Sequence, residues 1–442
     1  MGHTASVTGR VLRMRNHGGL AFAQLQDGLT QLQVMLTAAS CGDVPLGRWR
    51  RLVDIGDHVS VTGEVVTSRR GELSVAATDW VMAAKCLHPL PDKRKGFTDP
   101  EARVRQRHLD LVMNPESLRM MQQRSAAVRA LRNGFENRGF IEVETPMLQA
   151  VHGGANARPF VTHINAYDTE LFLRIAPELF LKRLSVGGMG KIFELNRNFR
   201  NEGADATHNP EFTSVEAYQP YADYHVMREL TRELLIEAAT AVYGKPVVRR
   251  DGEEIDISGE WPVVTVHDAV GRAAGTAIDS ETPVERLREL CAEHNVHTTF
   301  EMSAGELVLE LYDELVEPAT TLPTFYTDFP LETSPLTRNH RTNPRLAERW
   351  DLVAFGAEIG TAYSELVDPV EQRRRLTEQS LKAAAGDPEA MSLDEDFLSA
   401  LEYAMPPTGG LGIGVDRVMM MLTGQNIRST LAFPFVRPAP RD

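Results

Sequence analysis

Short runs in which apolar and polar residues alternate fill the first ninety residues of the chain, and glycine-containing turns separate them. A period of two is typical of strands with one buried face, and such turns are typical of hairpins. Five short strands in so short a segment predict a small closed barrel, for which the OB-fold is the natural five-stranded architecture. The predicted strands cover residues 7–12, 20–25, 31–36, 58–66 and 72–76.

The hydrophobic pattern changes after residue 89, where two prolines and a basic cluster predict a linker. Later segments carry apolar residues at helical spacing, and strand-like runs stand among them without the regular spacing of βαβ units. This order predicts an α+β domain on an antiparallel sheet. The predicted helices cover residues 116–138, 223–243 and 284–316, and the predicted strands 171–175, 191–195, 212–218 and 350–355. We expect a barrel domain over residues 1–90, a linker over 91–110 and a second domain over 111–442.

The charge balance and the cysteines narrow the classes of function. With 47 Lys and Arg against 61 Asp and Glu, the net charge of −14 argues against indiscriminate binding to nucleic acid or anionic lipid, while a local basic face stays compatible with it. No apolar run is long enough to predict a membrane segment, and the first residues do not resemble a signal peptide. Three cysteines far apart argue against disulfides or zinc and favour a reducing, cytoplasmic location.

Two segments carry candidate chemistry. In the first, Arg200 ends a predicted strand and Phe212 begins the next, so the hairpin could offer phosphate contacts and a stacking face to a nucleotide. Taken alone, a solvated polar hairpin is the commoner interpretation. In the second, the glycine-rich residues 409–414 lead into Arg417, which could meet the far end of a triphosphate; such glycines also often serve only close packing. The two segments together are a more specific signal for a nucleotide site, and no P-loop or Rossmann pattern competes with it.

These segments resemble the motifs of a known family. Residues 139–146, 200–212 and 410–417 are similar to motifs 1, 2 and 3 of the class II aminoacyl-tRNA synthetases, and the preceding barrel resembles that of subclass IIb. Four further segments are similar in sequence to lysyl-tRNA synthetase: residues 103–112, 152–160, 175–183 and 364–366. The resemblance implies a class II antiparallel-sheet catalytic domain with flanking helices behind an OB-fold anticodon-binding domain. It also implies a helical insertion at about residues 265–320, between motifs 2 and 3, and a homodimer formed through motif 1.

The resemblance further implies partners and residue roles. The partners are tRNA-Lys, ATP and L-lysine, with Mg²⁺ as cofactor, and the catalytic residues are Arg200 and Arg417. ATP would contact Arg200, Glu202, His208, Phe212, Glu358 and Arg417. Lysine would contact Gly154, Glu178, Arg200, Glu216, Tyr218, Thr361, Tyr363 and Glu365. Asp351 and Glu358 would hold Mg²⁺, and Phe22, Gln33 and Glu72 would read the anticodon, although Phe22 is equally suited to fill the barrel.

The expected activity is ATP-dependent formation of lysyl-adenylate and transfer of lysine to tRNA-Lys. A buried pair of carboxylates, Glu216 and Glu365, would be costly without a cation and so would reject neutral amino acids. The usual bacterial enzyme has asparagine at position 361 and glutamate at 351, and other segments are closer to the actinobacterial synthetase module often fused to a membrane lysyl-phosphatidylglycerol transferase. Alternatives therefore stay open: lysyl-tRNA made for lipid modification or specialised biosynthesis, amino-acid activation without tRNA or of a lysine analogue, which Thr361 leaves open, or a regulatory nucleic-acid binder.

Overall fold

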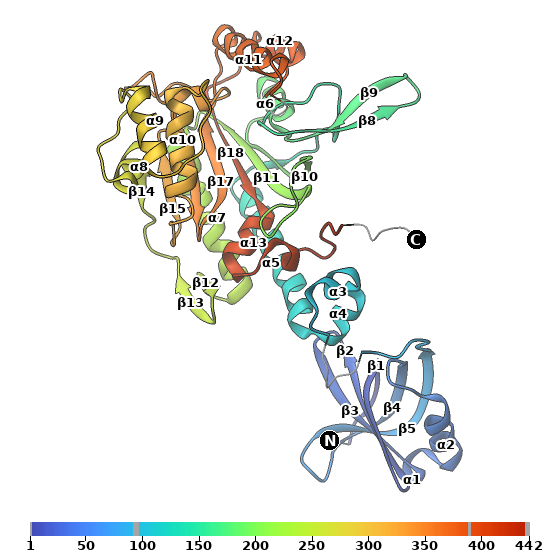
Figure 1. The fold of residues 1–442 in the computed structure, drawn as a ribbon. Helices are drawn as coiled ribbons and strands as arrows, with labels where there is room; N and C mark the ends of the chain where they lie inside the picture. The colour runs from blue at the N-terminus through green and yellow to red at the C-terminus, as the bar shows by residue number, and fades with distance from the viewer. Residues whose placement is uncertain (1, 92–96, 388–389, 438–442) are drawn as a thin grey trace. The chain divides into compact units, whose positions relative to one another are not determined.

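A computed structural model describes residues 2–91, 97–387 and 390–437 of the chain (Figure 1). The chain divides into two units, Met1–Gln122 and Gln123–Asp442, and each is described by itself. No helix within the described ranges is long and apolar enough to cross a membrane. The predicted domain boundaries remain predictions, and residues 92–96 of the expected linker lie outside the described residues.

The first unit contains a closed five-stranded barrel, as predicted. Its strand order is β1-β2-β3-β5-β4, antiparallel except for the β3–β5 pair. The barrel is filled by small and branched side chains such as Ala21, Ala23 and Val34, which alternate with outward-facing residues. The strands are β1 (Thr4–His17), β2 (Leu20–Asp27), β3 (Thr30–Thr37), β4 (His58–Thr67) and β5 (Leu73–Ala84).

Two short helices that the hydrophobic pattern did not reveal join β3 to β4. They are α1 (Ala38–Cys41) and α2 (Asp43–Leu52), and α2 buries Trp49 completely against the edge of the Trp80 ring. After the barrel come α3 (Pro100–Arg105) and α4 (Arg107–Met113), and then the long helix α5 (Pro115–Asn137) begins. The fully buried Asp110 accepts hydrogen bonds from Arg103 and Arg107 at 2.6 Å each, and this pairing holds the two short helices together.

An eight-stranded sheet forms the centre of the second unit, in the order β14-β15-β16-β17-β18-β11-β10-β6 (Figure 1). Its six central strands are antiparallel, which confirms the predicted fold class, and only the edge strands β6 and β14 pair in parallel. The strands are β6 (Ile141–Glu142), β10 (Ile192–Phe199), β11 (Glu211–Pro220), β14 (Val263–Thr265), β15 (Thr324–Thr327), β16 (Arg349–Ala354), β17 (Ala357–Ser364) and β18 (Thr408–Gly414).

Smaller strands stand apart from this sheet. The run predicted at residues 171–175 overlaps β9 (Thr169–Leu173), which belongs to a three-stranded sheet with β7 (Leu148–Gln149) and β8 (Phe160–Ile164). A separate hairpin pairs β12 (Val247–Arg250) with β13 (Glu253–Asp256).

Helices flank the sheet, and the predicted segments 116–138 and 223–243 correspond to α5 and α7 (Tyr224–Tyr243). The predicted segment 284–316 is two helices, because Ser303 starts a new helix with a capping box to Glu306. In Figure 1, α8, α9 and α10 gather beside β14 and β15 at one end of the sheet. The remaining helices are α6 (Glu178–Val186), α8 (Val266–Ala274), α9 (Val284–Glu293), α10 (Ala304–Leu315), η1 (Leu331–Thr333), α11 (Pro369–Ala384), α12 (Glu395–Leu401), α13 (Val415–Thr423) and α14 (Ile427–Thr430).

Aromatic packing fastens α5 to the sheet. The ring of Phe135 stacks on that of Phe193 in β10 at 4.8 Å and meets Phe140 edge-on at 5.2 Å. Phe135 and Phe193 are fully buried. The segment resembling motif 1 is therefore anchored to the same strand, β10, that leads into Arg200.

We expect Phe135→Ala to lower the free energy of unfolding by about 3–5 kcal/mol, because a large cavity replaces two ring contacts. Urea denaturation followed by circular dichroism measures this change. Tyr167→Ala is the matched control, since Tyr167 is 78 % exposed, and should change stability by less than about 0.5 kcal/mol. Equal effects of the two substitutions would contradict the assigned packing.

Candidate active site

A cavity of about 480 Å³ lies over strands β11, β17 and β18 of the large sheet. It brings together residues that are up to 273 positions apart, from Gly154 to Ile427. With the exception of Asp351, the cavity is lined by every residue of the second unit that the sequence analysis assigned to ATP, lysine or metal: Gly154, Glu178, Arg200, Glu202, His208, Phe212, Glu216, Tyr218, Glu358, Thr361, Tyr363, Glu365 and Arg417.

Glycine-rich β18 runs through the middle of the cavity floor, paired with β11 on one side and β17 on the other. A Cβ atom on Gly410 would stand 1.9 Å from a carboxylate oxygen of Glu365 and 2.7 Å from the Tyr218 ring. Glycine is therefore required at this position because two side chains of the cavity occupy the space. Of the two interpretations of this segment, ligand approach and close packing within the protein, close packing holds at Gly410, because protein side chains fill the space.

Arg200 and Arg417 stand at one end of the cavity. The Arg200 guanidinium lies 5.1 Å above the ring of Phe212, and its buried Nε has no hydrogen-bond partner among the described residues. Burial lowers the pKa of Arg200, and nearby Arg417 lowers it further against the opposing carboxylates Glu202 and Glu358. A buried guanidinium with an unused donor is suited to bind an anion.

Arg417, in the first turn of α13, joins the two motif-like segments. Its Nη1 donates to the main-chain oxygen of Glu358 at 2.9 Å, and its Nη2 lies 3.4 Å from Nε2 of His208. The loop carrying His208 is held by Asp205, which accepts from the His208 main-chain nitrogen at 2.8 Å. Hydrogen bonds from the Thr207 main chain and His208 hold the pKa of Asp205 well below its usual range.

The two carboxylates expected to hold a metal differ in accessibility. Glu358 lines the cavity, whereas Asp351 is 3 % exposed and lies behind the cavity wall. Both Asp351 oxygens accept hydrogen bonds from Arg349, at 3.0 and 2.7 Å, and Thr361 donates to one of them at 2.6 Å. No cluster of three or more metal-ligating side chains is present in the part of the chain that the structure describes.

The contacts of Thr361 also limit what it offers a ligand. Its hydroxyl lies 2.6 Å from the Asp351 carboxylate and 3.1 Å from the main-chain oxygen of Trp350. A hydroxyl has one proton to donate, and here that proton is used within the sheet. Thr361 can therefore accept a hydrogen bond from a ligand but has no free donor for a ligand carboxylate.

Carboxylates dominate the other end of the cavity. Glu216 and Tyr218 project from β11, Glu365 follows β17, and Glu178 begins α6. Glu216 has no ion-pair partner among the described residues, and burial, reinforced by the charge of Glu178, raises the pKa of Glu216 well above its usual value. Gly154 adopts a φ of +86° beside Glu178, where a Cβ would come within 3.0 Å of the Glu178 Cβ. This end of the cavity is suited to a cation.

Lys182 is a member of this cluster that the sequence analysis did not single out. It is completely buried, and its Nζ lies 2.6 Å from Glu178 Oε1 and 2.5 Å from Glu365 Oε2. Burial opposes the charge of Lys182, but Glu178 and Glu365 outweigh burial and raise its pKa. The spacing of four residues from Glu178 on a helix was the available sequence signal. No sequence signal indicated the contact between Lys182 and Glu365.

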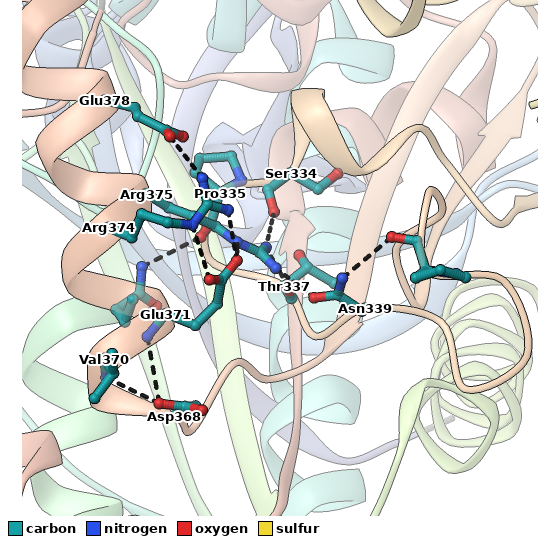
Figure 2. A network of polar contacts seen from close by, with 12 residues as sticks. Ser334, Pro335, Thr337, Asn339, Asp368, Val370, Glu371, Arg374, Arg375 and Glu378 are labelled. Carbon is teal, nitrogen blue, oxygen red and sulfur yellow. Dashed lines mark hydrogen bonds and ion pairs between the residues drawn. The ribbon is translucent and has the colours of Figure 1, made fainter.

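A loop that borders the cavity, residues 333–337, is held from behind by α11 (Figure 2). Arg375 donates to the main-chain oxygens of Ser334 and Thr337 at 3.3 and 2.7 Å, and Gln372 donates to that of Pro335 at 3.2 Å. Glu371 pairs in turn with Arg375, as Figure 2 shows. No pattern in the sequence predicted this support, because it consists of contacts between a helix and a loop about forty residues earlier.

The candidate anticodon residues lie on the barrel. Phe22 is half-buried on β2 between the buried Ala21 and Ala23, so strand alternation places it on the outer face and not in the barrel core. Gln33 on β3 shares that face through its register and donates a hydrogen bond to Ser74 at 2.8 Å. Glu72 is exposed and immediately precedes β5.

Comparisons with known proteins agree with this arrangement. The family described as tRNA synthetases class II (D, K and N) matches residues 99–437, and the OB-fold nucleic acid binding domain matches residues 5–83. Similar relatives are the lysylphosphatidylglycerol biosynthesis bifunctional proteins LysX of Nocardia farcinica and Gordonia bronchialis, each 57 % identical over 99 % of this chain, and of Rhodococcus opacus, 55 % identical over 99 %. The chain spans 39–40 % of the length of these relatives.

The Arg349–Asp351 pair predicts a strong effect on stability. Arg349→Met leaves a buried carboxylate without its partner and should lower the free energy of unfolding by about 3–5 kcal/mol at pH 7. Urea denaturation measures this free energy of unfolding. Arg374→Met is the control, because Arg374 is 53 % exposed and its ion pairs should contribute less than about 1 kcal/mol to stability. Adding Asp351→Leu to Arg349→Met should recover most of the loss. A double variant as unstable as the single one would contradict the pairing.

Proposed function

This chain belongs to the class II tRNA synthetases of the aspartate, lysine and asparagine group, and we propose that it activates L-lysine with ATP and transfers it to tRNA-Lys. One observation carries the choice of lysine: a single cavity has anion-binding guanidinium groups at one end and Glu216, which lacks an ion-pair partner among the described residues, at the other. A long amino acid with a cationic tip matches both ends. A neutral side chain would leave a buried carboxylate uncompensated.

ATP would occupy the end that contains Arg200 and Arg417. Arg200 would hold the α-phosphate together with the substrate carboxylate, and Arg417 would hold the γ-phosphate. Phe212 would stack on adenine, and Glu202 and His208 would orient the nucleotide. The unused Nε donor of Arg200 and the convergence of Arg417 with His208 support these roles.

Lysine would lie across the glycine strand toward the carboxylates. Glu178 would accept the α-ammonium, and Glu216 with Tyr218 and Glu365 would surround the ε-ammonium. Tyr363 would flank the aliphatic stem. Glu365 Oε1 supports this orientation, because it is buried and has no hydrogen-bond partner among the described residues.

Two transfers follow from this placement. A lysine carboxylate oxygen attacks the α-phosphorus of ATP, and the bond to pyrophosphate breaks. A ribose hydroxyl at the tRNA 3′ end then attacks the activated carbonyl and releases AMP. In the first step no side chain has to move a proton, so the chain's contribution is to align the reactants and neutralise charge through Arg200 and Arg417.

Magnesium fits the donors at this end of the cavity in part. When bound, Mg²⁺ would neutralise the phosphate oxygens, and such ions are usually held by one or two carboxylates together with substrate phosphates. Glu358 is the carboxylate we propose for it. Asp351 would reach the ion only by exchanging its contacts with Arg349 and Thr361.

The remaining partners follow from the family. The barrel would bind the anticodon of tRNA-Lys through Phe22, Gln33 and Glu72, and the motif 1 segment would form a homodimer. We propose a cytoplasmic location for this part of the protein. Because the similar relatives are named for lysylphosphatidylglycerol biosynthesis, a second candidate is that the lysyl-tRNA supplies lipid modification. A third candidate is activation of a lysine analogue, because the Thr361 hydroxyl already donates its proton to Asp351 and has none for a ligand carboxylate.

The proposal predicts lysine-dependent exchange of label between pyrophosphate and ATP. In a panel of amino acids and lysine analogues, L-lysine should give the highest kcat/KM, and neutral amino acids should be at least about a thousandfold worse, since each leaves buried polar groups unpaired. Charging of total tRNA then tests the acceptor. Exchange with an analogue alone would favour the third candidate, and no exchange with any amino acid would remove the proposed activity.

Glu216→Gln should separate binding of the two substrates. The KM for lysine should rise about ten- to a hundredfold, the value of one charge-assisted hydrogen bond, while the KM for ATP should change less than about threefold. Because the folded-state pKa of Glu216 is raised, its contribution to stability is lost as pH rises through that pKa. Glu216→Gln should therefore be more stable than the wild-type chain at pH 8, and the gain should shrink toward pH 5. Equal increases in both KM values would contradict the assigned role.

A further inference from the structure

Lys182 places an ammonium group inside the carboxylate cluster that receives the substrate. Its side chain is completely buried and contacts two carboxylates of the cavity at once, Glu178 at 2.6 Å and Glu365 at 2.5 Å. A buried lysine is costly unless the surrounding groups repay its desolvation. The residue therefore has a purpose that an apolar side chain at this position on α6 would not fulfil.

Counting charges suggests that purpose. Three carboxylates line the lysine end of the cavity, Glu178, Glu216 and Glu365, and one ammonium, Lys182, lies among them. Two negative charges remain. A substrate lysine whose carboxylate rests on Arg200 presents two ammonium groups to this end, so the remaining charge equals what the substrate brings.

Other charged groups near the cluster are already balanced or lie elsewhere. On β10, Glu194 pairs with the buried Arg174 at 2.7 Å. On β16, Arg349 pairs with Asp351. Burial raises the pKa values of Tyr218 and Tyr363, so both stay neutral. Burial raises the pKa of Glu216 well above its usual value and that of Glu365 to about 8, the latter against the opposing charge of Lys182. The count of three carboxylates and one ammonium therefore describes the fully ionised cluster, which a substrate with two ammonium groups would stabilise.

We propose that Lys182 is a positioning residue that aims Glu178 and Glu365 into the cavity and favours their ionised forms, so that protons compete less with the substrate at these two groups. The inference rests on the proposed function and deepens it. Without Lys182, two carboxylates would face one another in a buried site and would share a proton near neutral pH. Binding of a cationic substrate would then have to displace that proton.

Support of the cavity loop is a weaker explanation of Lys182. Its Nζ lies 3.5 Å from the main-chain oxygen of Leu336, a longer contact than either ion pair. Arg375 and Gln372 already hold the neighbouring oxygens of that loop. Gln372 is therefore the matched control, because it supports the same loop without adding charge to the cavity.

The test compares Lys182→Met with the wild-type 442-residue chain by ATP–pyrophosphate exchange between pH 6 and pH 8. The ratio of the lysine KM of the variant to that of the wild type should be about twofold higher at pH 6 than at pH 8, because protons compete with the substrate more strongly in the variant, whereas Glu365 of the wild type, whose pKa burial raises to about 8, loses part of its proton by pH 8. The KM for ATP should keep a constant ratio across this range.

Lys182→Met/Glu365→Gln restores the count of two negative charges and removes the proton-sharing pair. It should have a pH-independent KM ratio and a lower lysine KM at pH 6 than Lys182→Met. Gln372→Met should also give a pH-independent ratio. If Lys182→Met does not fold, recovery of folded, lysine-dependent activity in the double variant supports the proposal, and failure of the double variant overturns it.

The outcomes separate this inference from the proposed function. A wild-type chain with no lysine-dependent exchange refutes the function. A wild-type chain with lysine-dependent exchange, combined with a pH-independent ratio for Lys182→Met or a double variant no better than the single one, refutes the role of Lys182 alone.

Discussion

The burial of unlike charges at two ends of one sheet surface is the constraint on which this site depends. Guanidinium groups at one end and carboxylates at the other would each be unstable in isolation, and the protein compensates them only in part. Asp351 is fully engaged by Arg349 and Thr361, and Glu365 by Lys182 on one oxygen only. Arg200, Glu216 and one oxygen of Glu365 are incompletely paired and line the cavity, where ligands of opposite charge would compensate them.

The backbone makes this arrangement possible. A strand of glycines between β11 and β17 lets Glu365 and Tyr218 occupy space that any side chain at Gly410 would take. The loop at residues 333–337 is held by side chains of α11 and α6, so one wall of the cavity is fixed by hydrogen bonds to its main-chain oxygens. A rigid wall is what a selective site for a small cation requires, because misplacement by one ångström weakens short polar contacts strongly.

The relatives set this site in a larger context. The family shows that the chain is a class II tRNA synthetase with an OB-fold domain, and the similar LysX proteins are more than twice its length. Their names refer to lysylphosphatidylglycerol biosynthesis and belong to the whole of those longer proteins. The matched part covers 99 % of this chain and 39 % of the Nocardia farcinica relative.

The sequence by itself determined the barrel and the antiparallel sheet, because alternation is local, and its resemblance to known motifs supplied thirteen of the residues that line the cavity. It predicted one helix over residues 284–316 where Ser303 starts a second, and it did not reveal α1 and α2, whose apolar period is short. Only the tertiary structure decided how the charges pair. Lys182 contacts Glu365, which lies 183 positions later in the chain, and Asp351 pairs with Arg349 and lies away from the cavity. No sequence periodicity predicts these contacts, because they depend on which strands and helices become neighbours in the folded chain.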